Sequence, residues 1–130
     1  MFIEFSEKDI LRGKLIEPAF YRATIENVEE ALSKNGDSTN WILTGTIKFN
    51  ADNGSKDFAG VPTPYWNFNS KAPGFFIGML GALGIDPQPG VRYDPKALIG
   101  KEVDVFISNE LYEGRMINRI PHRYRAPRTE

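Results

Sequence analysis

Apolar and polar residues alternate along much of this chain, as they do in β-strands that bury one face. The pattern is present at residues 20–29, at residues 40–49 and again at residues 102–112. The side chains predicted to face inward in these three strands are Tyr21, Ala23, Ile25, Trp41, Leu43, Ile47, Phe49, Val103, Val105 and Ile107. Gly45 falls on the inward face of the second strand, where a missing side chain permits a bulge or a sharp bend.

Two further strands are expected at residues 58–69 and 115–121. Asn35-Gly36 and Asn53-Gly54 mark the turns between the first three strands, because Asn-Gly favours the backbone of tight hairpin turns. Glu113-Gly114 marks the turn between the last two strands. The chain is therefore predicted to contain five strands.

One helix is predicted between the third and fourth strands. Its apolar stripe, at helical spacing, consists of Phe76, Met79, Leu80 and Leu83. Ser70 suits its N-terminal cap, Pro73 its first turn and Gly84 its end. Three glycines inside the helix cost about 1 kcal/mol each relative to alanine, and they are Gly74, Gly78 and Gly81. Such a helix is expected to pack closely against the sheet.

Five strands with a helix between the third and fourth indicate a mainly β protein with the OB-fold, a small five-stranded barrel. A five-stranded α+β sandwich is the alternative. The expected organisation is an N-terminal arm or extension at 1–19, the OB-fold domain at 20–121 and a basic C-terminal tail at 122–130. The role of residues 1–17 stays open.

Composition narrows the possible chemistry. The 130 residues suit one domain, and the lack of cysteine excludes disulfides and thiolate ligands. His122 is the single histidine, which leaves little for a metal site or a Ser-His triad. Glu102 and Asp104 share a strand face, but alternating acids on an outer face are usually solvated. We expect no enzyme activity, no cofactor and no metal.

The longest apolar stretch, residues 75–85, has eleven residues and is too short to span a bilayer. The acidic N-terminal residues lack the apolar core of a signal peptide. A soluble cytoplasmic protein without a membrane partner is therefore expected.

Four segments carry a resemblance to a known family. In chain order they are "YRATIENVEE", "FFIGMLGALGI", "DPKALIGKEVDVFI" and "YEGRMINRI". Over roughly residues 20–121 the chain resembles small phage-encoded single-stranded DNA-binding proteins. The resemblance implies an OB-fold, a location in the host cytoplasm and protection of single strands during phage replication or recombination. Bacterial proteins of this function usually end in an acidic peptide that recruits partners, whereas this chain ends in "HRYRAPRTE".

Single strands are bound by cations that follow the phosphates and by aromatic rings that stack on bases. Residues 112–130 carry five arginines against two glutamates, although the whole chain has a net charge of −1. In an OB-fold the binding groove crosses the second and third strands and the loops beside them. The candidate binding residues are Lys34, Trp41, Lys48, Tyr65, Asn67, Lys71, Tyr112, Arg115, Arg119, Arg123, Tyr124 and Arg125.

The direction of the side chains in the third strand decides which rings are available. Trp66 and Phe68 are expected inside, so that Tyr65 and Asn67 face outward with Asn69, although the inverse arrangement stays open. Trp41 suits core packing and base stacking equally well.

These observations predict a sequence-tolerant single-stranded DNA-binding protein that works with replication or recombination proteins. A protein-interaction module of OB-like fold, which recruits a replisome or host factor, is the alternative. A protein that sequesters small nucleotides is a third option. The sequence leaves RNA against DNA, binding-site size and the oligomeric state open, a homo-oligomer included.

Overall fold

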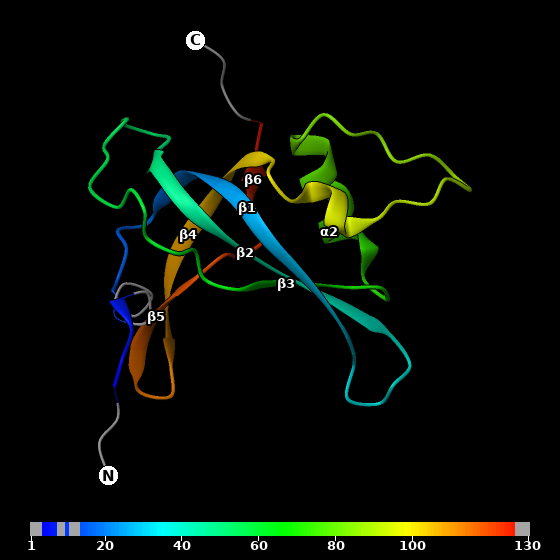
Figure 1. The fold of residues 1–130 in the computed structure, drawn as a ribbon, viewed down its shortest axis with the longest axis horizontal. Helices are drawn as coiled ribbons and strands as arrows, with labels where there is room; N and C mark the ends of the chain where they lie inside the picture. The colour runs from blue at the N-terminus through cyan, green and yellow to red at the C-terminus, as the bar shows by residue number, and fades with distance from the viewer. Residues whose placement is uncertain (1–3, 8–9, 11–13, 127–130) are drawn as a thin grey trace.

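The computed structural model describes residues 4–7, 10 and 14–126. The strands and helices are β1 (Ala19–Leu32), β2 (Thr39–Asn50), β3 (Trp66–Asn69), α2 (Pro73–Ala82), the 3₁₀ helix η1 (Pro95–Leu98), β4 (Glu102–Tyr112), β5 (Arg115–Arg119) and β6 (Tyr124–Arg125). All strand pairs are antiparallel, in the order β3-β2-β1-β4-β5, and β6 pairs with β4. The tips of the β1–β2 and β4–β5 hairpins diverge to opposite sides of the molecule (Figure 1).

β1 is the central strand, and it pairs with β2 along one edge and with β4 along the other. Its register against β2 shifts between Ile25 and Asn27, which oppose Gly45 and Thr44. A Cβ atom at Gly45 would lie 2.2 Å from the carbonyl oxygen of Thr24. The predicted bulge or bend at Gly45 is confirmed, because no side chain fits where the two backbones approach.

Most of the predicted inward side chains form the core. Of those ten, eight are buried, namely Tyr21, Ala23, Ile25, Leu43, Ile47, Val103, Val105 and Ile107. The prediction for Phe49 is wrong. A second register shift leaves Lys48 without a partner in β1, so Asn50 takes the buried place and the Arg22 guanidinium carbon lies 5.1 Å from the Phe49 ring centroid. One extra residue in a strand exchanges its two faces.

The third predicted strand is shorter than expected. Residues 60–63 follow the edge of β2 through isolated hydrogen bonds, such as Thr63 N to the Gly45 oxygen at 2.9 Å, and β3 begins only at Trp66. Within β3 the predicted directions are confirmed. Trp66 is 2% exposed and Phe68 is buried, whereas Asn67 is exposed and the neighbouring Tyr65 is 57% exposed.

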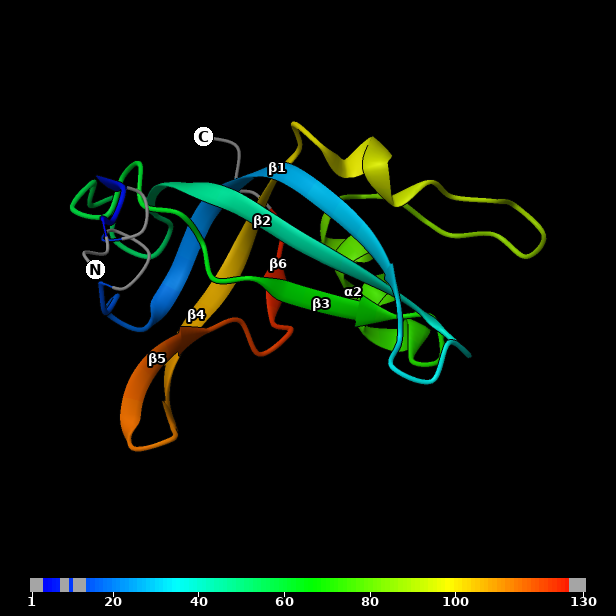
Figure 2. The ribbon, with the colours of Figure 1, turned by 60° about the horizontal axis from the view of Figure 1, so that its bottom comes forward.

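Helix α2 lies between β3 and β4 in the chain, as predicted, beside one end of the sheet (Figure 2). Met79 and Leu80 are buried. Gly84 has a φ of +77° and the Ile85 N–H donates to the Leu80 oxygen at 2.8 Å, so the predicted helix end is confirmed. No helix in the described part of the chain has the length and apolar composition needed to cross a membrane.

One expectation for this helix, the cap at Ser70, is wrong. Ala72, not Ser70, occupies the N-cap position of α2, and no side chain caps the helix. The Ser70 hydroxyl instead accepts a hydrogen bond from the Thr39 N–H at 2.9 Å. The helix does pack against the sheet as expected, since the ring centroid of Phe76 lies 5.1 Å from that of Phe68 in β3. Its glycines take no part in this packing, because a Cβ atom built on Gly74, Gly78 or Gly81 would meet nothing within 4 Å.

The chain ends belong to the fold more closely than their composition predicts. Ile16 is buried, its N–H donates to Asn118 Oδ1 at 2.8 Å, and its oxygen accepts from Asn109 Nδ2 at 2.9 Å. Part of the predicted arm is therefore fixed on the β4–β5 hairpin. Likewise, residues 124–125 of the predicted tail form β6. Residues 127–130 lie outside the described part.

The protein is mainly β, with an antiparallel sheet and one α-helix between β3 and β4, but the sheet is not closed. A closed five-stranded barrel would join β3 to β5. Among the described residues β3 pairs only with β2 and β5 only with β4. The predicted barrel is therefore not confirmed.

Candidate nucleic-acid interface

A groove lies where the free edges of β3 and β5 approach each other. A hollow of about 370 Å³ is lined by Tyr65, Trp66, Asn67, Ile117, Asn118, Arg119, Ile120 and His122. A second hollow of about 470 Å³ shares three of these residues and adds Phe75, Ser108, Asn109, Glu110 and Pro121. Because Arg119, Ile120 and His122 belong to both, we treat the two hollows as one and call it the seam groove.

Aromatic rings stand on both sides of the seam groove. Tyr65 contributes one ring from the β3 side. On the other side the ring of Phe75 stacks on His122 at a centroid distance of 4.5 Å and an interplanar angle of 19°. Phe75 is 56% exposed, so part of its side chain is accessible to a ligand.

His122 is held in place from several directions. Its backbone has a φ of +55°, which is uncommon for a residue other than glycine. Nδ1 lies 2.9 Å from the Tyr124 hydroxyl. Burial, followed by the charge of Arg119, lowers the pKa of His122 below its usual 6.5, so the neutral ring predominates at pH 7. An uncharged, fixed imidazole suits stacking better than it suits proton transfer.

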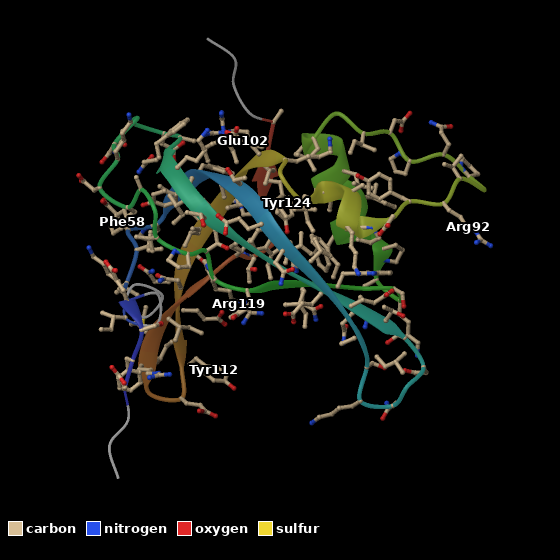
Figure 3. All side chains as sticks on the ribbon, viewed as in Figure 1. Phe58, Arg92, Glu102, Tyr112, Arg119 and Tyr124 are labelled. Carbon is tan, nitrogen blue, oxygen red and sulfur yellow. The ribbon has the colours of Figure 1, made fainter. Side chains whose placement is uncertain are left out.

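Arg119 is the cation that both hollows share. Its side chain is largely exposed and forms an ion pair with Glu110 at 2.9 Å. Exposed pairs of this kind contribute about 0–1 kcal/mol, so a phosphate can replace Glu110 at little cost. Figure 3 shows Arg119 nearer to β3 than Tyr112, which lies toward the far end of the β4–β5 hairpin.

A row of amides continues from Asn67 along the outer face of β2 and β3. Asn69 Nδ2 donates to Asn40 Oδ1 at 2.7 Å, and Asn67 Nδ2 donates to the same oxygen at 3.4 Å. Asn69 also reaches the Ser38 hydroxyl at 3.1 Å. These bonds hold Asn67 beside the seam groove.

Three of the twelve predicted binding residues therefore line the seam groove: Tyr65, Asn67 and Arg119. The structure adds Phe75 and His122, which the sequence did not assign to a binding site. Phe75 lies next to the apolar stripe of α2 but outside it. An aromatic residue outside the stripe was the feature of the sequence that could have indicated a binding residue.

The predicted residues near the β1–β2 turn lie away from the groove. Lys34 is exposed in the turn itself. Lys71 forms an ion pair with Asp37 and thereby lowers the pKa of that carboxyl. Trp41 is half-buried and stacks on Phe76 at a centroid distance of 6.2 Å, so it packs against the core.

The predicted binding residues at 123–125 lie over β1 and β4 instead. Arg125 pairs with Asp52 at 3.0 Å and with Asp104 at 3.7 Å. The guanidinium carbon of Arg123 lies 4.5 Å from the Phe106 ring centroid. Burial raises the pKa of Tyr124, which contacts the core. These three residues do not line the seam groove.

The expectation that Asp104 is solvated is wrong. Its side chain is 1% exposed and accepts a hydrogen bond from Arg22 Nε at 2.5 Å. Glu102 lies at the edge of the same network, 3.1 Å from the predicted binding residue Lys48. The two acids serve ion pairs within the sheet, and Lys48 is engaged there.

The last two predicted residues lie at the end of the β4–β5 hairpin. Tyr112 and Arg115 are paired across the turn, and both are exposed. Leu111 and Met116, the next pair, are exposed apolar residues. This tip is a surface separate from the seam groove.

Comparison with known proteins adds no functional assignment. No family model and no curated protein sequence matches this chain. A functional proposal consequently depends on the residues of the seam groove.

Proposed function

We propose that this protein binds single-stranded DNA in the seam groove, with little dependence on base sequence and without catalysis. The observation that carries the proposal is that Tyr65 and the Phe75–His122 stack line adjoining hollows, and that Arg119 lines both. Rings that stack on bases and a cation that contacts phosphates are the two components of sequence-tolerant single-strand binding.

The arrangement of the strands supports the same proposal. β1 is shared between β2 and β4, and a helix lies between β3 and β4, as in an OB-fold. We propose that the sheet is an OB-fold barrel opened between β3 and β5. The resemblance to phage single-stranded DNA-binding proteins agrees with this interpretation and suggests a role in phage replication or recombination.

A pair of tyrosine substitutions tests the proposal. Tyr65 and Tyr112 are similarly exposed, at 57% and 55%, but only Tyr65 lines the seam groove. A stacked base contributes about 1–3 kcal/mol, so Tyr65→Ala should weaken binding to a thymidine oligomer about 5-fold or more. Tyr112→Ala is the matched control and should bind like the wild type.

Fluorescence anisotropy with labelled single-stranded DNA, duplex DNA and RNA of equal length measures these affinities. Single strands should bind much more tightly than the duplex. If the two tyrosine variants lose the same affinity for single-stranded DNA, the seam groove is not the binding site. The absence of binding to every oligomer would contradict the proposed function itself.

The hairpin tip supports one alternative, a protein-interaction module that recruits a replication or recombination protein. Leu111 and Met116 form an exposed apolar pair there, 67% and 49% exposed. Such a module would lose its partner in a Leu111→Ser/Met116→Ser variant and keep it in Tyr65→Ala. The single-strand proposal instead predicts that oligomer binding weakens in Tyr65→Ala and is kept in the Leu111→Ser/Met116→Ser variant.

A further inference from the structure

Trp66 has a buried hydrogen-bond donor with no acceptor. Its side chain is 2% exposed, and the indole Nε1 has no hydrogen-bond partner within the described part of the chain. Buried donors are nearly always satisfied, because an unsatisfied one loses its bond to water without replacement. A donor of this kind calls for an acceptor that the described residues do not supply.

The seam groove is the route by which that acceptor can arrive, because Trp66 is one of its lining residues. Nε1 itself is covered, so the side chains that share the groove must shift before a ligand reaches it. Tyr65 lines the same hollow and is 57% exposed, and we expect it to move onto a stacked base when the base binds, whereas His122 stays in place.

Two side chains that line this hollow, the indole of Trp66 and the guanidinium of Arg119, can only donate hydrogen bonds. Asn118 is already engaged, since its Oδ1 accepts from the Ile16 N–H at 2.8 Å and its Nδ2 donates to the Lys14 oxygen at 2.7 Å. A base that presents an acceptor to Trp66 Nε1 therefore fits this donor, and one that presents an amino group to it does not.

Bases differ in this respect at one exocyclic position. Thymine and guanine carry a carbonyl oxygen there, whereas cytosine and adenine carry an amino group. We propose that one nucleotide site in the seam groove prefers keto bases, because the exocyclic carbonyl accepts a hydrogen bond from Trp66 Nε1. This inference rests on the proposed single-strand binding, and it adds a specificity-determining residue at one position of a site that is otherwise tolerant.

Thymidine and cytidine oligomers of equal length provide the comparison, since both are pyrimidines with weak self-stacking. The wild type should bind the thymidine oligomer about 3- to 10-fold more tightly than the cytidine oligomer, which is the contribution of one hydrogen bond. Trp66→Phe removes the N–H but keeps an aromatic ring, and it should bind both oligomers equally. Trp41→Phe is the matched control, because Trp41 stacks on Phe76 outside the groove and its loss should leave the ratio unchanged.

A second measurement avoids any effect of the substitution on folding. The wild-type chain has two tryptophans, so its ¹⁵N-labelled form gives two indole N–H signals, which the two variants assign. The Trp66 signal should move downfield on addition of the thymidine oligomer and much less with the cytidine oligomer. If both oligomers bind and this signal responds to them equally, the inference is overturned while the proposed function stands. If neither oligomer binds, the proposed function fails, and the inference with it.

Discussion

Asp104 is a carboxylate almost completely removed from solvent, with two arginines against it. Arg22 of β1 donates to it at 2.5 Å, and Arg125 of β6 approaches it at 3.7 Å while also pairing with Asp52. The network thus joins three strands through one side chain. Its contribution is conditional, because a buried ion pair stabilises a fold only while every charge keeps its partner.

Neutralising this carboxylate should therefore be costly. Asp104→Asn leaves Arg22 without its main counter-charge in a mostly buried position, and we expect the free energy of unfolding to fall by about 3 kcal/mol. Urea denaturation followed by circular dichroism measures the loss. The control is Asp37→Asn, which removes an exposed partner of Lys71 and should leave the urea midpoint nearly unchanged. Similar midpoints for the two variants would mean that the Asp104 network is not structural.

At the scale of elements, two glycines of this chain have opposite roles. Gly45 in β2 faces the backbone of β1 at the bulge, where no side chain fits. Gly78 in α2 faces open space, so its lack of a side chain serves no packing purpose in the described structure. Glycine in an exposed helix interior costs about 1 kcal/mol relative to alanine.

The same substitution should consequently have opposite effects at the two positions. Gly45→Ala places a Cβ atom 2.2 Å from the Thr24 oxygen, so the strands must separate and stability should fall by about 2 kcal/mol or more. Gly78→Ala should raise stability by about 0.5–1 kcal/mol. Thermal and urea unfolding of both variants measure these changes. A loss of stability in Gly78→Ala would show that this face of α2 is covered by something the chain contacts.

At the scale of the whole molecule, the core followed from the alternation of apolar and polar residues within each strand. The groove, in contrast, is formed by segments that are far apart in the sequence. The inward residues of β1 and β4 followed from a period of two, because burial of one face acts on every second residue. Phe49 departs from that period because Lys48 is an extra residue in β2 with no partner in β1. Only the register of the two strands reveals this extra residue. The direction of Trp66 and Phe68 was predictable from the size of their side chains.

The groove itself could not be predicted in the same way. Phe75 comes from α2 and His122 from the segment after β5, and only the tertiary fold stacks one on the other. The basic residues near the C-terminus suggested one cationic surface, but pairing within the fold separates them. Arg125 turns to Asp104 and Asp52, whereas Arg119 lies in the seam groove.

This distribution of charge determines how binding should respond to salt. Several predicted cations lie outside the seam groove in ion pairs with acidic residues, among them Lys48, Lys71 and Arg125. Each phosphate contact on a single strand contributes about −0.7 to the slope of log K against log salt. With Arg119 as the main cation of the groove, we expect a shallow slope of about −1 to −2, since stacking supplies most of the affinity. Arg119→Gln should flatten the slope by about 0.7, whereas Arg115→Gln, at the hairpin turn, should leave it unchanged. A slope several times steeper, insensitive to Arg119, would place the bound strand on another face of the molecule.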